Sequence, residues 1–254
     1  MQAFVESSVR NYTAEITFGT PKSNSLPGEI LEKLAQTILD ESAKDEVKVI
    51  LLKSEGKKAF CAGASFDELL VINDLETSKK FFGGFAKVLN AMRTCGKIVV
   101  VRVQGKTTGG GVGLACAADY CFATEDSALA LTEINLEIGP FVISPFVERK
   151  IGKSQMIAMS LDAEFRDANW ALHHNIYNKV SPTISEMDEA IEKFLQRLAI
   201  KNHKVLAKIK ELSWEGTEYF DKILPQKISI SANLVLEESA KNNILKIKEN
   251  LGKK

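Results

Sequence analysis

The sequence predicts an α/β core followed by a helical C-terminal region, and three observations support this prediction. Patterns typical of strands and helices alternate through the first half of the 254-residue chain. Two segments rich in glycine and alanine each follow an apolar, β-branched run and precede a predicted helix. After about residue 185, apolar residues recur only at helical spacing. The alternating order of strand and helix implies right-handed crossover connections.

Local patterns predict the first elements in turn. Residues 13–18 alternate as the residues of a half-buried strand do. One face of this strand is expected to hold Tyr12, Ala14, Ile16 and Phe18. A turn with two prolines follows, and residues 28–42 carry an apolar stripe at helical spacing, which predicts a helix. Residues 47–52 form an apolar run with one lysine, as in a buried strand.

The same patterns predict the later elements. Apolar side chains at helical spacing predict a helix over residues 77–93, and the run at 98–103 predicts another buried strand. Residues 109–117 are expected to form a helix whose first turn consists of glycines. Two short strands are expected at 120–123 and 128–131. Further helices are expected at residues 167–175, 185–199, 201–212 and 219–237.

Composition narrows the class of protein. Hydrophobic residues make up 45% of the chain, charged residues 26%, and the formal net charge is zero, so we expect neither a nucleic-acid nor a membrane partner. No apolar run approaches the ~20 residues of a membrane helix, and the first ten residues do not resemble a secretory signal. The four cysteines lack zinc-type spacing, so we expect reduced thiols, no metal and a cytoplasmic location.

The length allows one large domain with an appendage. We therefore divide the chain into an α/β core at residues 1–195 and a C-terminal helical region at residues 196–254.

The two segments rich in small residues direct attention to carbonyl chemistry. Residues 60–66 read FCAGASF, and residues 104–113 read QGKTTGGGVG. Small residues leave backbone N–H groups open to a ligand. Two such donors that point at one atom would form an oxyanion hole, which stabilises negative charge on a carbonyl oxygen.

Neither segment is a nucleotide fingerprint. A Walker A loop requires a glycine five residues before Gly105, where this chain has Val100. A dinucleotide fingerprint that began at Gly111 would require a third glycine at Cys116. Glu133 follows the second short strand in an apolar context, where burial would raise the carboxyl pKa into a range useful for proton transfer. The alternative is a carboxylate that complements the dipole at a helix start.

In this order and spacing, the motifs resemble those of the crotonase superfamily, the enoyl-CoA hydratase/isomerase group, over nearly the full chain. The matching segments are residues 21–26, 60–64, 109–111, 119–123 and 132–133. The resemblance implies a spiral of repeated β-β-α turns with a C-terminal helical region that forms trimers, or hexamers built as paired trimers.

The resemblance also implies the substrate and the site. The substrate would be a coenzyme A thioester, with no cofactor beyond the coenzyme A it carries. The N–H groups of Ala64 and Gly110 would hold the thioester oxygen, and Glu133 would move the proton. The implied substrate-binding residues are Lys22, Ala62, Ser65, Phe66, Gly109, Gly113 and Phe141.

One departure from the family pattern leaves the reaction open. The second catalytic glutamate of family hydratases falls at Gly113, and Glu68 and Glu137 are the candidates to replace it, although neither is at the expected position. One base is enough for a double-bond shift, whereas hydration usually uses two carboxylates. The chain resembles hydratases at least as closely, so we expect either hydration or a double-bond shift of a short or branched enoyl-CoA, in fatty acid or branched-chain amino acid degradation. A decarboxylase, a hydrolase or a non-catalytic acyl-CoA-binding protein is the alternative.

A second departure lies at residues 143–146, where Phe146 together with Phe141 is expected to reshape the acyl pocket.

Overall fold

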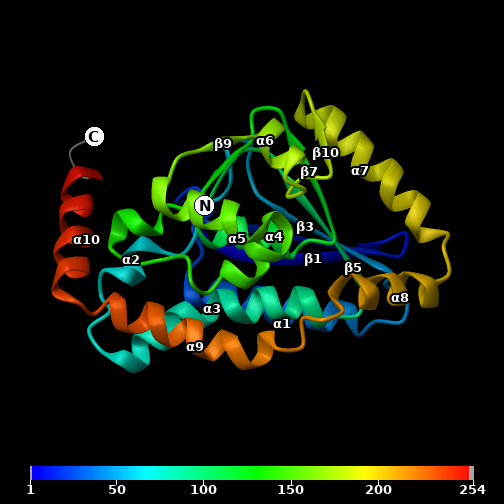
Figure 1. The fold of residues 1–254 in the computed structure, drawn as a ribbon. Helices are drawn as coiled ribbons and strands as arrows, with labels where there is room; N and C mark the ends of the chain where they lie inside the picture. The colour runs from blue at the N-terminus through cyan, green and yellow to red at the C-terminus, as the bar shows by residue number, and fades with distance from the viewer. Residues whose placement is uncertain (1, 252–254) are drawn as a thin grey trace.

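The computed structural model describes residues 2–251 and confirms the α/β fold (Figure 1). The strands are β1 (Phe4–Arg10), β2 (Thr13–Gly19), β3 (Val49–Ser54), β4 (Ala59–Cys61), β5 (Ile98–Val103), β6 (Lys106–Thr108), β7 (Tyr120–Thr124), β8 (Ala128–Ala130), β9 (Arg166–Asp167) and β10 (Lys179–Ser181). The helices are α1 (Gly28–Ser42), α2 (Phe66–Leu69), α3 (Leu75–Thr94), α4 (Gly110–Ala117), the 3₁₀ helix η1 (Glu133–Leu136), α5 (Ser144–Asp162), α6 (Ala168–His173), α7 (Ile184–Ala199), α8 (His203–Trp214), α9 (Phe220–Leu234) and α10 (Glu238–Leu251).

A six-stranded sheet forms the centre of the molecule, with strand order β1-β2-β3-β5-β7-β10. β1 pairs with β2 in the antiparallel sense, and the other pairs are parallel. Every residue of β5, whose sequence is IVVVRV, is buried, as expected for a parallel strand covered on both faces. Residues of α1 and α3 pack on one face of the sheet, and residues of α7 and α8 pack on the other.

A second, smaller sheet positions the candidate site. Its strand order is β4-β6-β8-β9, and β4, β6 and β8 run parallel. The carboxyl ends of adjacent parallel strands meet at one edge of a sheet, where ligands commonly bind. The segments that follow these strands contain Ala64, Gly110 and Glu133, so the sheet topology brings together residues far apart in sequence.

Most predicted elements are confirmed, because the apolar residues whose spacing predicted them are buried in the structure. The helix at 28–42 and the strand at 98–103 have the predicted bounds. The placement of Tyr12 on one strand face with Ala14, Ile16 and Phe18 is wrong. Tyr12 lies in the turn between β1 and β2 with φ of 62°, and 52% of its surface is exposed. Lys48 Nζ lies 4.4 Å from the centroid of its ring.

Several elements were not predicted, and for two of the longer ones the structure gives a physical reason. β1 is an edge strand, and only Val5 in it is buried, so its apolar pattern is weak. α5 is interrupted at Gly152, whose φ of +75° breaks the helical period of its side chains. α7 continues across residue 195, and the division of the chain into two parts there stays a prediction.

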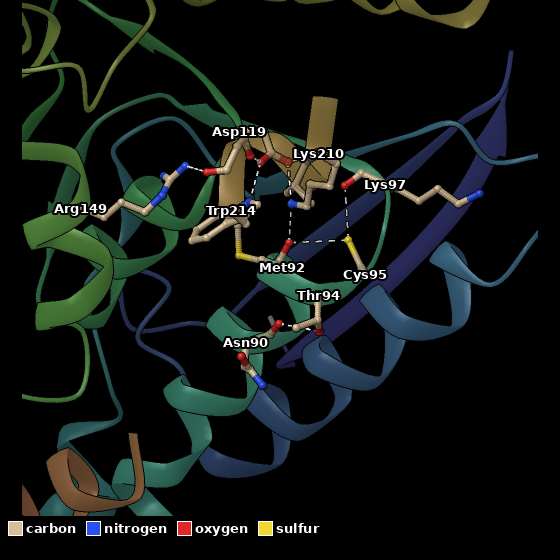
Figure 2. Close-up of polar contacts among 11 residues, drawn as sticks. Asn90, Met92, Thr94, Cys95, Lys97, Asp119, Arg149, Lys210 and Trp214 are labelled. Atoms are coloured by element: carbon tan, nitrogen blue, oxygen red, sulfur yellow. Dashed lines mark hydrogen bonds and ion pairs between the residues drawn. The ribbon is translucent and has the colours of Figure 1, made fainter. Parts of the chain in front are cut away.

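A buried ion pair joins the C-terminal helices to the core (Figure 2). The carboxylate of Asp119, between α4 and β7, accepts hydrogen bonds from Lys210 Nζ at 2.6 Å and Trp214 Nε1 at 2.8 Å. It also accepts the backbone N–H of Val99 at 2.7 Å, and Lys210 donates to the carbonyl of Met92 in α3 at 2.6 Å. These contacts connect α8 to both the sheet and α3.

The formation of trimers or hexamers by the C-terminal helical region stays a prediction.

None of the helices in residues 2–251 has the length and hydropathy that crossing a bilayer requires. Cys116 lies on α4 and Cys121 on β7, as expected, and both are buried free thiols. Burial raises the pKa of both thiols above the ordinary value, which leaves them uncharged at neutral pH.

Candidate active site

A cavity of about 950 Å³ opens where the segments after β4, β6 and β8 meet. Its wall also contains residues of α2, α3, α9 and α10, so the C-terminal helices help to enclose it. Ten residues were predicted to form the site. Those in the cavity wall are Lys22, Ala62, Ala64, Phe66, Gly109, Gly110 and Glu133.

The two segments rich in small residues lie against each other at the cavity. Gly63 has φ of +81°, a conformation that glycine adopts without strain. A Cβ placed on Gly63 would lie 3.6 Å from the backbone nitrogen of Gly110 and 3.3 Å from the carbonyl oxygen of Thr108. The segment is held from its other side, because the Gly63 carbonyl accepts the N–H of Leu26 at 2.8 Å. Glycine at position 63 therefore permits the close approach of the two segments.

The N–H groups of Ala64 and Gly110 are available to a ligand. Neither of them donates to an acceptor among the described residues. Gly110 is the first residue of α4, whose positive dipole end faces the same region. Two free backbone donors on adjacent segments are suited to bind a carbonyl oxygen that gains negative charge.

Glu133 places a carboxyl group next to these donors. It is the first residue of η1, and a Cβ on Gly109 would lie 3.3 Å from Glu133 Oε1. Oε2 of Glu133 is buried and has no hydrogen-bond partner among the described residues. Burial raises the pKa of Glu133 from 4.5 to about 7, against a smaller opposite effect from its own backbone N–H. Near neutral pH the group can therefore both accept and donate a proton.

Neither of the two candidates to replace the second catalytic glutamate, Glu68 and Glu137, is in the described cavity wall. Glu68 Oε2 accepts the backbone N–H of Gly28 at 2.8 Å, so it caps the start of α1. Glu137 is exposed and has a left-handed backbone conformation with φ of 57°. Asp67 does lie in the cavity wall, where it pairs with Lys22.

The position of the missing glutamate is apolar and tightly packed. A Cβ on Gly113 would lie 2.8 Å from Ile143 Cγ2 and 3.1 Å from Leu89 Cδ1. A larger side chain at this position would require Leu89 and Ile143, which itself lines the cavity, to move. Gly113 is also not among the described residues of the cavity wall.

Two more of the predicted substrate-binding residues lie outside the described wall. Ser65 caps α2, where its Oγ accepts the N–H of Glu68 at 3.4 Å. Phe141 packs on Gly139, where an added Cβ would lie 2.4 Å from its ring. Phe146 does not reach the acyl pocket either, because it packs against Phe220 with ring centroids 5.1 Å apart.

The sequence did not single out several residues of the wall. Phe81, Phe82 and Phe85 of α3 had the pattern of an ordinary apolar helix stripe, and nothing in that pattern distinguishes a cavity wall from a core. Ser231 of α9 and Lys248 of α10 also line the cavity. No sequence signal marks them, because only the packing of α9 and α10 on α3 and η1 brings them there.

Fold and site together define the class of protein. The molecule is an α/β protein in which two free backbone donors lie beside a buried carboxyl group. The model of the enoyl-CoA hydratase/isomerase family matches residues 9–246. The chain belongs to this family and is an enzyme of the crotonase superfamily.

Relatives and solved structures cover most of the chain. A "Probable enoyl-CoA hydratase" of Bacillus subtilis (strain 168) is 26% identical over 217 residues, which are 85% of this chain and 83% of the relative. A trans-2-decenoyl-acyl-carrier-protein isomerase of Streptococcus mutans is 25% identical over 217 residues, 83% of this chain and 81% of the relative. The crystal structure of an enoyl-CoA hydratase from Bacillus halodurans matches with a TM-score of 0.90 at 19% identity, over 95% of this chain and 99% of that chain.

The packing at Gly110 leads to a testable prediction. A Cβ on Gly110 would lie 2.3 Å from Cζ of Phe85, so Gly110→Ala is expected to lower stability by about 1–3 kcal/mol. The control is Gly83→Ala within α3, where the Cβ would lie 3.9 Å from Ile228 Cδ1 and alanine is expected to add up to about 1 kcal/mol. Chemical denaturation of both variants measures the difference. Equal stability of Gly110→Ala and wild type would contradict the tight packing.

Proposed function

We propose that this protein transfers a proton on an acyl-CoA thioester, with Glu133 as acid and base. The N–H groups of Ala64 and Gly110 hold the enolate oxygen. The observation that carries the proposal is the convergence of these groups at the ends of β4, β6 and β8. Each fixed donor lowers the barrier by about 3 kcal/mol, and the start of α4 contributes in the same sense.

The reaction that fits one carboxylate best is a double-bond shift. Glu133 takes a proton from C2 of a 3-enoyl thioester, and the electron pair moves into an enolate. The protonated carboxyl then returns the proton at C4, which leaves the double bond between C2 and C3. A pKa of about 7 suits a group that must be a base in the first half and an acid in the second. The apolar packing at Gly113 supports this choice over a two-carboxylate mechanism.

Hydration is the second candidate, favoured by the name of the Bacillus subtilis relative. It would require a second group to orient water. The described cavity wall offers Thr132 and Asn135, which flank Glu133 in the chain, and Asp67, which is paired with Lys22.

The remainder of the cavity wall supports a coenzyme A ligand. Lys22 is exposed and can exchange its contact with Asp67 for a phosphate, since exposed ion pairs are weak. Ala62, Phe66 and Gly109 also line the cavity. In our proposal they contact the pantetheine arm, which runs from Lys22 to Glu133.

Turnover in heavy-oxygen water tests the proposal. Crotonyl-CoA, 3-methylglutaconyl-CoA and 3-hexenoyl-CoA are incubated separately with the protein, and the products are analysed by mass spectrometry. We expect 3-hexenoyl-CoA to become the 2-enoyl isomer without uptake of heavy oxygen. The isomers have equal mass, so chromatography before detection separates them.

Other outcomes lead to different conclusions. Product that carries heavy oxygen in place of the isomer would mean hydration. Loss of carbon dioxide or release of free coenzyme A would mean a decarboxylase or a hydrolase. Tight binding of all three thioesters without product would mean a non-catalytic acyl-CoA-binding protein.

A further inference from the structure

Two buried oxygen atoms of the cavity wall have no hydrogen-bond partner among the residues that the structure describes. Within residues 2–251, the buried side-chain oxygens without a hydrogen bond belong to Glu133, Tyr177 and Ser231. Glu133 and Ser231 line the cavity, and Tyr177 is not among the described residues of the wall. Buried polar atoms are nearly always paired, so each exception requires an explanation. The proposed chemistry explains Glu133 but leaves Ser231 unexplained.

Ser231 differs from a neighbouring serine on the same helix. Ser229 Oγ donates to the carbonyl of Pro225 at 2.9 Å, the usual bond of a serine within a helix. Ser231 is only 1% exposed and makes no such bond. The carbonyl of the next residue, Ala232, accepts Ser78 Oγ at 3.0 Å, which places this part of α9 against the first turn of α3. The Ser231 hydroxyl thus lies at the contact between α3 and α9, in the cavity wall.

The wall on this side of the cavity is apolar. Leu69 and Leu70, at the end of α2, and Phe81 and Phe82 of α3 line it. An acyl chain is the apolar part of a thioester ligand and matches such a wall. A pure hydrocarbon would leave the Ser231 hydroxyl unpaired, whereas a neutral oxygen on the chain would pair with it. Directly against these apolar side chains a neutral oxygen fits better than a carboxylate, although Lys248 of α10 also lines the cavity.

We infer that Ser231 determines specificity by a hydrogen bond to a hydroxyl or keto oxygen on the acyl chain, beyond the carbons that react. The preferred substrates are therefore oxygenated acyl thioesters. This inference rests on the proposed function in that it takes an acyl-CoA thioester as the ligand. The N–H donors proposed to hold the thioester belong to the segments after β4 and β6, whereas Ser231 belongs to α9.

Binding of saturated acyl-CoA pairs tests the inference without catalysis. Each pair has one chain length, from hexanoyl to decanoyl, with and without a hydroxyl or keto group. We expect wild type to bind the oxygenated member of at least one pair about 10-fold more tightly by calorimetry. Ser231→Ala is expected to lose this preference and to bind the hydrocarbon member as wild type does. Ser229→Ala, the matched control on the same helix, is expected to keep the preference.

Stability provides a second readout. Ser231→Ala removes an unpaired hydroxyl, so the ligand-free variant is expected to be at least as stable as wild type. A purely structural hydroxyl would give a less stable variant, and that result would overturn the inference. It would also be overturned if wild type showed no preference in any pair, or if Ser231→Ala kept the preference.

Turnover separates this inference from the proposed function. A binding preference that depends on Ser231, in a protein that transforms no enoyl-CoA, would support the specificity residue and overturn only the proposed reaction. Turnover of 3-enoyl-CoA without any preference would do the reverse. In the case where both hold, kcat/KM for oxygenated 3-enoyl thioesters falls about 10-fold in Ser231→Ala, and for hydrocarbon thioesters it is unchanged.

Discussion

Glu133→Gln is expected to lower kcat by about 10²- to 10⁴-fold, because glutamine cannot exchange the proton that the carboxyl group transfers. The amide retains the size of the side chain, so binding of saturated acyl-CoA is expected to change little. In wild type, kcat/KM is expected to rise with pH through an apparent pKa of about 7 as Glu133 ionises. Steady-state kinetics between pH 5 and 9 checks both results. A variant with full activity on every thioester that wild type turns over would contradict the role of Glu133.

The same substitution is expected to stabilise the protein at alkaline pH. The folded-state pKa of Glu133 lies above its unfolded value of 4.5, so the folded protein binds the proton more tightly. The free energy of unfolding of wild type therefore decreases between about pH 4.5 and pH 7 and stays lower above that range. A pKa shift from 4.5 to about 7 corresponds to about 3 kcal/mol. Oε2 of Glu133 is buried but the residue as a whole is partly exposed, so we expect Glu133→Gln to gain about 2 kcal/mol at pH 8 relative to its difference from wild type at pH 4.

Urea titrations at pH 4 and pH 8 measure this effect. The control is Glu137→Gln, four residues along the chain at an exposed position, which is expected to show no such pH dependence. If the difference in the free energy of unfolding between Glu133→Gln and wild type were equal at both pH values, the pKa of Glu133 would not be raised in the folded protein.

Asp119→Asn is expected to lower the free energy of unfolding by about 3–5 kcal/mol. The substitution keeps the shape of the side chain but leaves the Lys210 ammonium buried without a counter-charge. The carboxylate also receives hydrogen bonds from Val99, Ser213 and Trp214, so an amide NH₂ would face a donor where an oxygen now accepts. Chemical denaturation measures the loss.

The control is an exposed ion pair on α8, the helix of Lys210, and it separates the effect of burial from the effect of charge. Glu211 pairs with Lys208 at 2.6 Å, but both side chains are exposed, so Glu211→Gln is expected to cost less than about 1 kcal/mol. The double variant Asp119→Asn with Lys210→Met is expected to recover part of the loss, because no buried charge remains. A loss of under 1 kcal/mol in Asp119→Asn, or a double variant with fully additive losses, would contradict this account of the pair.

Much of the site was accessible to sequence reasoning because it depends on local chemistry. Gly63 is required where two backbone segments approach closely and Gly110 where the Phe85 ring packs on the chain, and such requirements appear in the sequence as runs of small residues. Glu133 was found because a carboxyl group in an apolar segment is unusual. The segments that carry these residues follow β4, β6 and β8, and their order in the chain already indicated strand-to-helix turns.

Other residues were misplaced because their positions depend on long-range packing. Tyr12 continues the alternation of β2, yet the tight turn after β1 directs it to solvent. Gly113 was expected to bind substrate, but the approach of Ile143 from the segment before α5 fills that position. Phe141 was also expected to bind substrate, but its ring packs on Gly139.

By itself, the sequence determined the α/β class, the bounds of elements such as α1 and β5, and the two glycine-rich segments with Glu133, because burial, helix period and backbone approach leave local signals. Only the tertiary structure decided which of these residues share a cavity. The register of β4, β6 and β8 brings the donors to Glu133, and the packing of α9 on α3 adds the Ser231 hydroxyl to the wall. Such contacts join residues as far apart in sequence as Ser78 and Ala232, a separation of 154 positions, and no local pattern encodes them.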